Sequence, residues 1–174
     1  MNTDKKYELT GYTEVMKDGT VLHRIRALRD ISLADGTKVA KGDLGGWLEN
    51  ESNLSQNGDS WVGDSARVYG KARVCVSAWV GDSAMVYGSA HIYSLSRIGG
   101  SARVYGESRV CGSAHIHGNA RVYGAAWVYA HAEVCGSAHI HGNARVYGMA
   151  WVHGCSEVCG DSCICGDMCI GEDA

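Results

Sequence analysis

The chain has 174 residues, with 24 glycines, no proline, no phenylalanine and a formal net charge of −3 at pH 7. This length fits one substantial domain, and the nearly balanced charge argues against a protein that binds nucleic acid through a strongly basic surface. No segment approaches the roughly 18 apolar residues of a membrane-spanning helix, and the polar start MNTDKKYELT lacks the apolar core of a secretion signal. We therefore expect a cytoplasmic protein with no membrane partner.

Residues 1–58 differ in texture from the rest of the chain. Residues 7–16 and 21–28 flank the turn sequence KDGT, which predicts a β-hairpin. The rest of the chain is a strand repeat, described below, and the open end of such a repeat presents unpaired strand edges that can pair with another copy. We therefore expect residues 1–58 to form a β-rich cap at one end of the molecule.

From Val62 onward, an aliphatic residue recurs every six positions, nineteen times without a break, up to Ile170. A small residue follows four positions after each of them, except at Met168, and glycine often stands two positions after, where a tight corner needs positive φ. A strand and a corner every six residues predict coils of three strands, stacked by parallel pairing. The expected fold is an all-β, triangular parallel β-helix of about six coils over residues 59–171, with an acidic tail at residues 172–174.

The pattern resembles the left-handed β-helix hexapeptide-repeat family, which has an aliphatic residue at its first position and Ser, Thr, Ala or Val at its fifth. Val104 with Ser108 and Val122 with Ala126 follow this rule, and the resemblance covers residues 59–171. It implies left-handed winding. The segment KGDLGGWL at 41–48, followed by ARVYG units, is similar to uncharacterised hexapeptide-repeat proteins of bacteriophages, prophages and gut bacteria, which often have transferase-like labels.

Residues 18 apart are expected to stack, so the outward side chains form columns. One face combines an arginine column with a tyrosine column. Its members are Arg67, Tyr69, Tyr87, Arg103, Tyr105, Arg121 and Tyr123, with Met85 among the arginines. This face is the candidate binding surface, for a protein partner first and for nucleic acid or another anionic ligand as the alternative. The competing interpretation is that these residue types simply suit the outer side of a strand and stack on their own kind.

Histidines and one cysteine form further columns that suggest zinc, the only cofactor for which the sequence offers ligands. The candidate ligands are His115, His117, Cys135, His139, His141 and His153. His117, Cys135 and His153 share one column, but its outer members are expected ~10 Å apart, too far for one ion. His115 and His117 project from one strand, with Glu133 above His115. We interpret such a pair as an adventitious site, so the sequence requires no cofactor.

An internal duplication bears on these histidines. Residues 113–136 recur at 137–160 with 19 of 24 positions identical. Because 24 is not a multiple of 18, each copied side chain is expected on the next face of the coil. On the sequence alone, this argues against a composite histidine site assembled by the duplication.

Five of the eight cysteines lie between residues 155 and 169. Their spacing, with either three or one intervening residues, is unlike the C-x-x-C pairs of zinc ribbons. Without a secretion signal we expect reduced thiols at tolerant outer positions, with a redox or metal role as the alternative.

As families, hexapeptide-repeat acyltransferases and gamma-type carbonic anhydrases are commonly trimers with active sites between subunits, and the transferases use a histidine, a projecting loop and an acyl-CoA donor. Here no loop interrupts the hexads, and the chain has no P-loop, nucleophile elbow or Ser-His-Asp constellation. We therefore name no catalytic residue. We expect a non-catalytic binding or scaffold protein, of the kind a phage encodes to act on a host macromolecule. A trimeric acyltransferase and a self-assembling structural protein are the alternatives. We also expect a homo-oligomer, either a dimer or a trimer.

Overall fold

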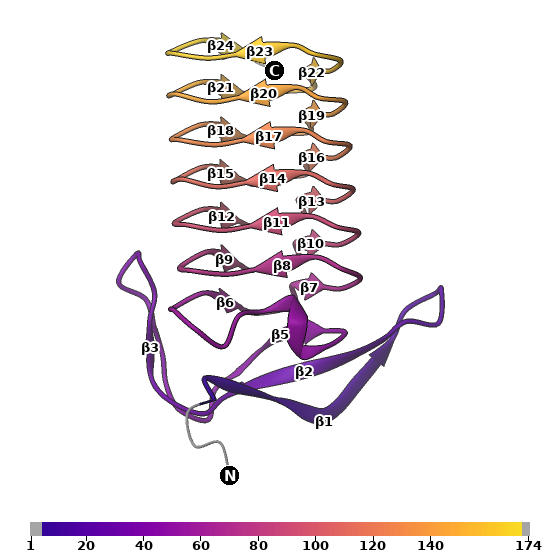
Figure 1. The fold of residues 1–174 in the computed structure, drawn as a ribbon, viewed down its shortest axis with the longest axis vertical. Coiled ribbons are helices and arrows are strands. Elements are labelled where there is room, and N and C mark those ends of the chain that lie inside the picture. Colours follow the sequence, from indigo (N-terminus) through magenta and orange to yellow (C-terminus); the bar gives the residue numbers. More distant parts are fainter. Residues whose placement is uncertain (1–4, 172–174) are drawn as a thin grey trace.

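The computed structural model describes residues 5–171, so the predicted acidic tail at 172–174 lies outside the described residues. Within them the protein is a parallel β-solenoid of about seven turns, with two antiparallel hairpins beside its N-terminal end (Figure 1). One 3-10 helix, η1 (Glu51–Asn53), is the only helical element among the described residues, and no helix there is long and apolar enough to cross a membrane.

The N-terminal region contains five strands. They are β1 (Tyr7–Val15), β2 (Val21–Ala27), β3 (Ile31–Ser32), β4 (Lys38–Val39) and β5 (Leu44–Leu48). β1 and β2 form the predicted hairpin around KDGT, and β2 pairs antiparallel with β5. β3 and β4 form a second hairpin, here called the arm, which projects beside the solenoid (Figure 1).

The solenoid has three faces, each a stack of strands that comprise two residues from β6 onward. The hairpin face continues the β1-β2 hairpin through β5, β7 (Arg67–Val68), β10 (Met85–Val86), β13 (Arg103–Val104), β16 (Arg121–Val122), β19 (His139–Ile140) and β22 (Glu157–Val158). The third face consists of β8 (Arg73–Val74), β11 (His91–Ile92), β14 (Arg109–Val110), β17 (Trp127–Val128), β20 (Arg145–Val146) and β23 (Cys163–Ile164). The arm face consists of β6 (Trp61–Val62), β9 (Trp79–Val80), β12 (Arg97–Ile98), β15 (His115–Ile116), β18 (Glu133–Val134), β21 (Trp151–Val152) and β24 (Cys169–Ile170).

Residues 18 apart lie in register, as the hexad period predicts. Val86, for example, pairs with Val68 on one side and Val104 on the other. The aliphatic positions and the small residues four positions later point inward, and nearly all of them are fully buried. Three serines that replace the inward alanine donate their hydroxyl to a backbone carbonyl three residues earlier: Ser96 Oγ donates to Tyr93 at 2.8 Å, and Ser108 and Ser156 do the same. The core is therefore a continuous aliphatic column along the solenoid axis.

The corners adopt the left-handed backbone conformation that favours glycine. Gly118, for example, has φ of +67°. Five corners carry another residue in the same conformation: Asp64, Val76, Asp82, Ser94 and Ala130. The repeat thus fixes the corner geometry even where the sequence does not supply glycine.

The solenoid begins earlier than the unbroken hexads do. β5 pairs parallel with β7, and Leu54 makes a parallel bridge with Val74. Leu48 and Leu54 are buried inward residues six apart, so residues 44–62 complete a turn before the regular spacing starts at Val62.

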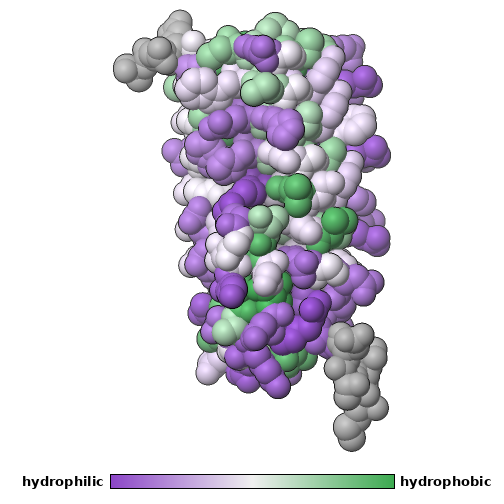
Figure 2. Space-filling model, turned by 90° about the vertical axis from the view of Figure 1, so that its left-hand side faces the viewer, coloured by the Kyte–Doolittle hydropathy of each residue, from purple (hydrophilic) through white to green (hydrophobic). Residues whose placement is uncertain are grey.

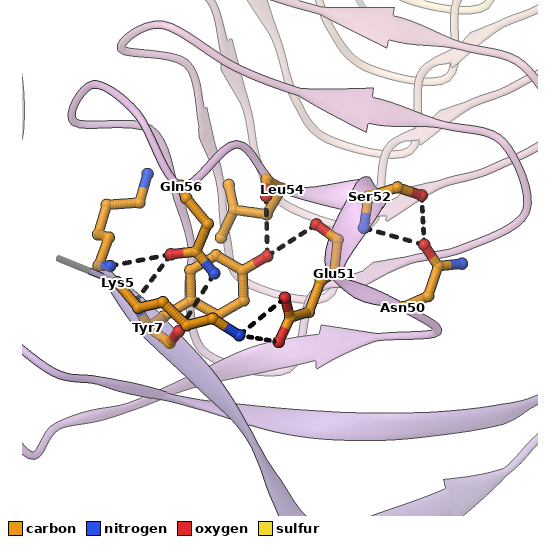
Figure 3. Close-up of polar contacts among 8 residues, drawn as sticks. Lys5, Tyr7, Asn50, Glu51, Ser52, Leu54 and Gln56 are labelled. Atoms are coloured by element: carbon orange, nitrogen blue, oxygen red, sulfur yellow. Dashed lines mark hydrogen bonds and ion pairs between the residues drawn. The ribbon is translucent and has the colours of Figure 1, made fainter. Parts of the chain in front are cut away.

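Polar contacts hold the first hairpin to this turn (Figure 3). The buried Tyr7 hydroxyl lies 2.8 Å from the carbonyl oxygen of Leu54 and 3.0 Å from that of Glu51. The Gln56 side chain accepts from the backbone N–H of Tyr7 and donates to its carbonyl, and Lys5 forms an ion pair with Glu51 at 2.7 Å. The hairpin therefore lies fixed at the N-terminal end, while its role as a cap and the left-handed winding stay predictions.

Candidate functional site

The tyrosine column predicted from the sequence forms a stacked ladder on the hairpin face. The rings of Tyr69, Tyr87, Tyr105 and Tyr123 are nearly parallel, with successive centroids 5.0, 4.8 and 5.0 Å apart. The ring of His141 continues the ladder, 4.8 Å from that of Tyr123. These centroid distances match the spacing of neighbouring strands, because parallel β pairing in register stacks identical aromatic residues on one another.

The arginine column lies beside this ladder in the predicted register. Arg67 is engaged: its Nε and Nη2 donate to the two carboxylate oxygens of Glu14 on β1, at 3.1 and 2.7 Å. Arg103 and Arg121 are exposed, and neither pairs with a carboxylate of residues 5–171. We call Arg103, Arg121 and the four tyrosines the Arg–Tyr face.

Three of the tyrosines on this face, Tyr69, Tyr87 and Tyr123, have a raised pKa. Burial raises the pKa of Tyr69 to about 12, with a further contribution from Tyr87, and burial also raises the pKa of Tyr87. The face therefore offers two guanidinium cations beside a row of phenol hydroxyls, a combination that suits carboxylates and other anions.

The first histidine cluster lies on the arm face. The rings of His115 and His117 are 4.7 Å apart, and His117 Nε2 lies 2.9 Å from Glu133 Oε1. Glu133 is in register with His115, as expected, but its carboxylate reaches diagonally to His117. One ligand atom from each of these three residues lies within 4.8 Å of the other two. Burial, and then the neighbouring His117, lower the pKa of His115, which favours its neutral, ligand-competent form.

The second cluster lies on the hairpin face. His141 Nε2 lies 2.7 Å from Glu157 Oε1, and ligand atoms of His141, Glu157 and Cys159 lie within 4.8 Å of one another. His139 is turned away from this group and lies edge-on to Tyr123, with centroids 6.4 Å apart. Glu157 and Cys159 were absent from the ligands expected from sequence, although both follow His141 by about one turn of the solenoid.

The predicted column of His117, Cys135 and His153 is divided among different partners. Cys135 is only 8% exposed and its Sγ accepts from Trp151 Nε1 at 3.2 Å. His153 Nε2 lies 3.3 Å from Cys169 Sγ. These contacts, like that of His117 with Glu133, join residues 16 apart, because side chains on adjacent strands interact diagonally as well as directly opposite.

All eight cysteines are free thiols in the structure. Five of them, namely Cys155, Cys159, Cys163, Cys165 and Cys169, lie within the last turn, and four of these five are exposed. Cys163 Sγ lies 3.5 Å from the Tyr147 hydroxyl, again 16 residues away. Their arrangement forms no four-thiol group, and only Cys159 joins a cluster of candidate ligands in residues 5–171.

A groove between the arm and the arm face was not predicted from the sequence. Asp35 at the arm tip forms an ion pair with Arg97 at 2.7 Å, and the Arg97 guanidinium lies over the Trp79 ring, 5.0 Å from its centroid. Leu33 and Leu95 complete the apolar lining of a cavity of about 170 Å³. Figure 2 shows hydrophobic residues gathered in the lower half of this side of the molecule.

The sequence did contain a signal for this groove. Gly63, Gly81 and Gly99 are 18 apart at an outward position where the next three turns carry histidine or cysteine. A Cβ at Gly81 would overlap the Trp79 ring, so the glycine lets the indole lie flat on the face. A column of outward glycines next to tryptophan therefore marks where another segment covers the solenoid.

The comparison with protein families agrees with this architecture. The family described as "YdcK Beta solenoid repeat" matches residues 114–130 and 138–154. The two matched segments occupy equivalent positions in the two copies of the duplication. The chain is thus a β-solenoid repeat protein. No curated protein matches its sequence.

Proposed function

We propose that this protein is a non-catalytic binding or scaffold protein whose Arg–Tyr face binds an acidic segment of a protein partner. The observation that carries the proposal is the pair Arg103 and Arg121. They are exposed, in register on adjacent strands, and without a carboxylate partner in the described chain. Two guanidinium groups one strand spacing apart, about 4.8 Å, suit an extended acidic segment.

The chain itself supports this mode of recognition. Glu14 on β1 binds Arg67 with both carboxylate oxygens, and Arg67 holds the same outward position two turns before Arg103. Such a two-point contact is stronger and more specific than a single charge contact. An acidic residue of a partner would repeat at Arg103 the contact that Glu14 makes at Arg67.

Rigidity favours binding at this face. The arginines extend from strands whose backbone is bonded to both neighbouring turns, and the tyrosine ladder limits side-chain motion beside them. A preorganised surface loses little conformational entropy on association. A protein partner is favoured over nucleic acid, because the same face ends in Glu157 and the whole chain carries a net charge of −3.

Membership of the hexapeptide-repeat family and a phage origin are also part of this proposal. The six-residue spacing of the two-residue strands supports a place among hexapeptide-repeat proteins. A phage origin and a host target rest on the sequence resemblance of residues 41–48 and the ARVYG units. The first hairpin, which continues the hairpin face beyond β5, serves in this proposal as a cap and as an extension of the contact surface.

A charge-reversal pair with a matched control tests the proposal. The probe is a fluorescently labelled synthetic peptide rich in Glu and Asp, with binding followed by anisotropy at low and physiological salt. R103E/R121E is expected to weaken binding at least 10-fold. R109E/R145E makes the same charge change at equivalent outward positions on the third face and is expected to leave affinity nearly unchanged.

Equal losses in the two double variants would show a non-specific response to net charge and would overturn the proposal. A single-stranded oligonucleotide of the same charge serves as the second probe. Tighter binding of the oligonucleotide than of the peptide at physiological salt would assign the face to nucleic acid instead.

A further inference from the structure

We propose that each copy of the 24-residue duplication carries its own site for a late first-row divalent cation such as Zn²⁺. The first site consists of His115, His117 and Glu133, and the second of His141, Glu157 and Cys159. The first site lies on a different face from Arg103 and Arg121, whereas the second adjoins the Arg–Tyr face, where His141 stacks on Tyr123.

The first site combines a short strand with its neighbour. His115 and His117 alternate with the inward Ile116, so both imidazoles project from the same outer side of β15. Glu133 adds a carboxylate from the adjacent β18. Tetrahedral coordination with bonds of about 2.0–2.1 Å places ligand atoms about 3.3 Å apart. His117 and Glu133 are already 2.9 Å apart, and no pair in the cluster exceeds 4.8 Å, so side-chain rotation alone can close the site.

The length of the duplicated unit explains why the histidine–glutamate contact is copied. From His115 to Glu133 the cluster lies within residues 113–136, because the unit is longer than one turn of the solenoid and so includes a strand and its neighbour in the next turn. The histidine–glutamate contact therefore recurs on the next face: His141 to Glu157 is 2.7 Å where His117 to Glu133 is 2.9 Å, whereas His139, the equivalent of His115, lies against Tyr123. The change of face between copies argues against a site composed of histidines from both copies. It does not argue against a site whose ligands all come from one copy.

The third ligand differs between the two sites: it is His115 in the first and Cys159 in the second. Cys135 and Cys159 are equivalent positions of the two copies. The indole N–H of Trp151 donates to Cys135 Sγ and leaves it 8% exposed, which withdraws this thiol from the first site. Cys159 is exposed, and no indole lies over it within residues 5–171. The first site is therefore a two-imidazole, one-carboxylate set, whereas the second offers imidazole, carboxylate and thiolate.

These donors select the class of cation. Imidazole and thiolate favour Zn²⁺, Co²⁺ or Ni²⁺, whereas Mg²⁺ and Ca²⁺ prefer sites made of oxygen alone. Three protein ligands on an outer face leave a fourth position open to water or to a ligand from another molecule. Metal-bound imidazole and thiolate must be deprotonated, so affinity is expected to fall at acid pH.

The experiment uses full-length, reduced protein without a histidine tag. Zn²⁺ binding is measured by calorimetry, and Co²⁺ binding by visible absorption, with the sulfur-to-cobalt band as a marker of the second site. We expect two ions per chain. H117A and H141A should each abolish one of the two bound ions. Loss of an outer-shell partner typically weakens metal binding about 10–100-fold, and loss of a direct ligand should weaken it at least as much. C159S should remove the sulfur band and leave the first site unchanged.

His91→Ala is the matched control, because His91 occupies the same outward hexad position as His115 on a different face and belongs to neither cluster. The proposal would be overturned if H117A and H141A left the number of bound ions per chain unchanged. It would also be overturned if H91A lowered that number equally. Absence of both binding heat and cobalt absorption at millimolar metal would overturn it as well, and would leave the histidine–glutamate contacts as simple cross-strand hydrogen bonds.

Discussion

Gly118 lies directly against Gly136 of the next turn. A Cβ added to Gly118 would lie 2.8 Å from the carbonyl oxygen of Gly136 and 2.9 Å from its amide nitrogen. Gly160 has the same backbone conformation, with φ of +63°, but an added Cβ there has nothing within 4 Å. The two glycines therefore separate the conformational reason for a corner glycine from the steric one.

We expect Gly160→Ala to lower the free energy of unfolding by about 1–2 kcal/mol, the cost of a left-handed conformation for a residue with a Cβ. Gly118→Ala adds the overlap with the next turn and is expected to cost a further 1–3 kcal/mol or so. Urea denaturation followed by circular dichroism measures both. Ala130→Gly, in an interior turn with φ of +61°, is the control and should stabilise the protein by about 1 kcal/mol. Equal effects of the first two variants would exclude the steric contribution.

Ile116 tests the packing of the core. It is fully buried, in register with Ile98 on one side and Val134 on the other. We expect Ile116→Val to cost about 0.5–1.5 kcal/mol and Ile116→Ala about 2–5 kcal/mol, because a column held in parallel register collapses poorly around a cavity. A loss below about 1 kcal/mol for the alanine variant in the same denaturation assay would show that the turns move together to fill the space.

Lys6 predicts an alkaline rise in stability. Its ammonium is fully buried and donates to the carbonyl of Ser60 at 2.7 Å, and desolvation, followed by the charge of Arg29, lowers its pKa from 10.5 to about 8. Between pH 8 and 10.5 this lysine binds fewer protons in the folded protein than in the unfolded chain, because its pKa is lower in the folded protein. The free energy of unfolding therefore rises with pH in that window. We expect a gain of about 1.5 kcal/mol between pH 8 and 9.5.

The control for this rise is Lys6→Met, which should show no gain over the same interval. Measurements stay below pH 10, because burial raises the pKa of Tyr7 above its usual range. Above pH 10 unfolded tyrosine ionises before folded tyrosine does, which lowers the free energy of unfolding. A wild-type curve parallel to that of Lys6→Met would show that Lys6 keeps its ordinary pKa in the folded protein.

Asp35 predicts the behaviour of the arm. Its carboxylate accepts from the backbone N–H of Thr37 at 2.9 Å and pairs with Arg97, and these contacts hold the pKa of Asp35 below its usual value, the Thr37 bonds being the larger cause. Asp35→Ala should accelerate amide hydrogen exchange across residues 33–37 about 10-fold. The melting temperature should change by less than about 2 °C, because the arm strands have only two residues each and the solenoid core is untouched. Asp18→Ala, which removes the equivalent turn contact with Thr20 in the first hairpin, should leave exchange in the arm unchanged.

The fold was largely predictable because one constraint repeats. A period of six with glycine at the corner leaves few ways to bury Val104 and its equivalents, and the structure confirms the all-β parallel solenoid. The turn between Leu48 and Val62 was harder, because β5 pairs antiparallel with β2 and parallel with β7. No local spacing encodes such a change of strand direction.

The candidate sites were predictable to the extent that they follow the backbone register. The tyrosine ladder depends on an offset of 18, which the period supplies. The contact of Glu133 with His117 depends instead on a diagonal offset of 16, which is decided by side-chain rotamers rather than by the repeat. The groove at Trp79 involves the arm, a segment far earlier in the chain, and only the glycine column indicated it.

The hydrogen bonds between turns also determine how the molecule responds to mechanical load. Tyr105 donates its amide to Val122, Tyr123 to Ile140, and so on along the chain, so each turn is bonded only to its immediate neighbours. Pulled from its C-terminal end, the solenoid should release one turn at a time. Each turn adds about 60 Å of extended chain, so the force–extension trace should be a series of nearly equal steps rather than one cooperative rupture.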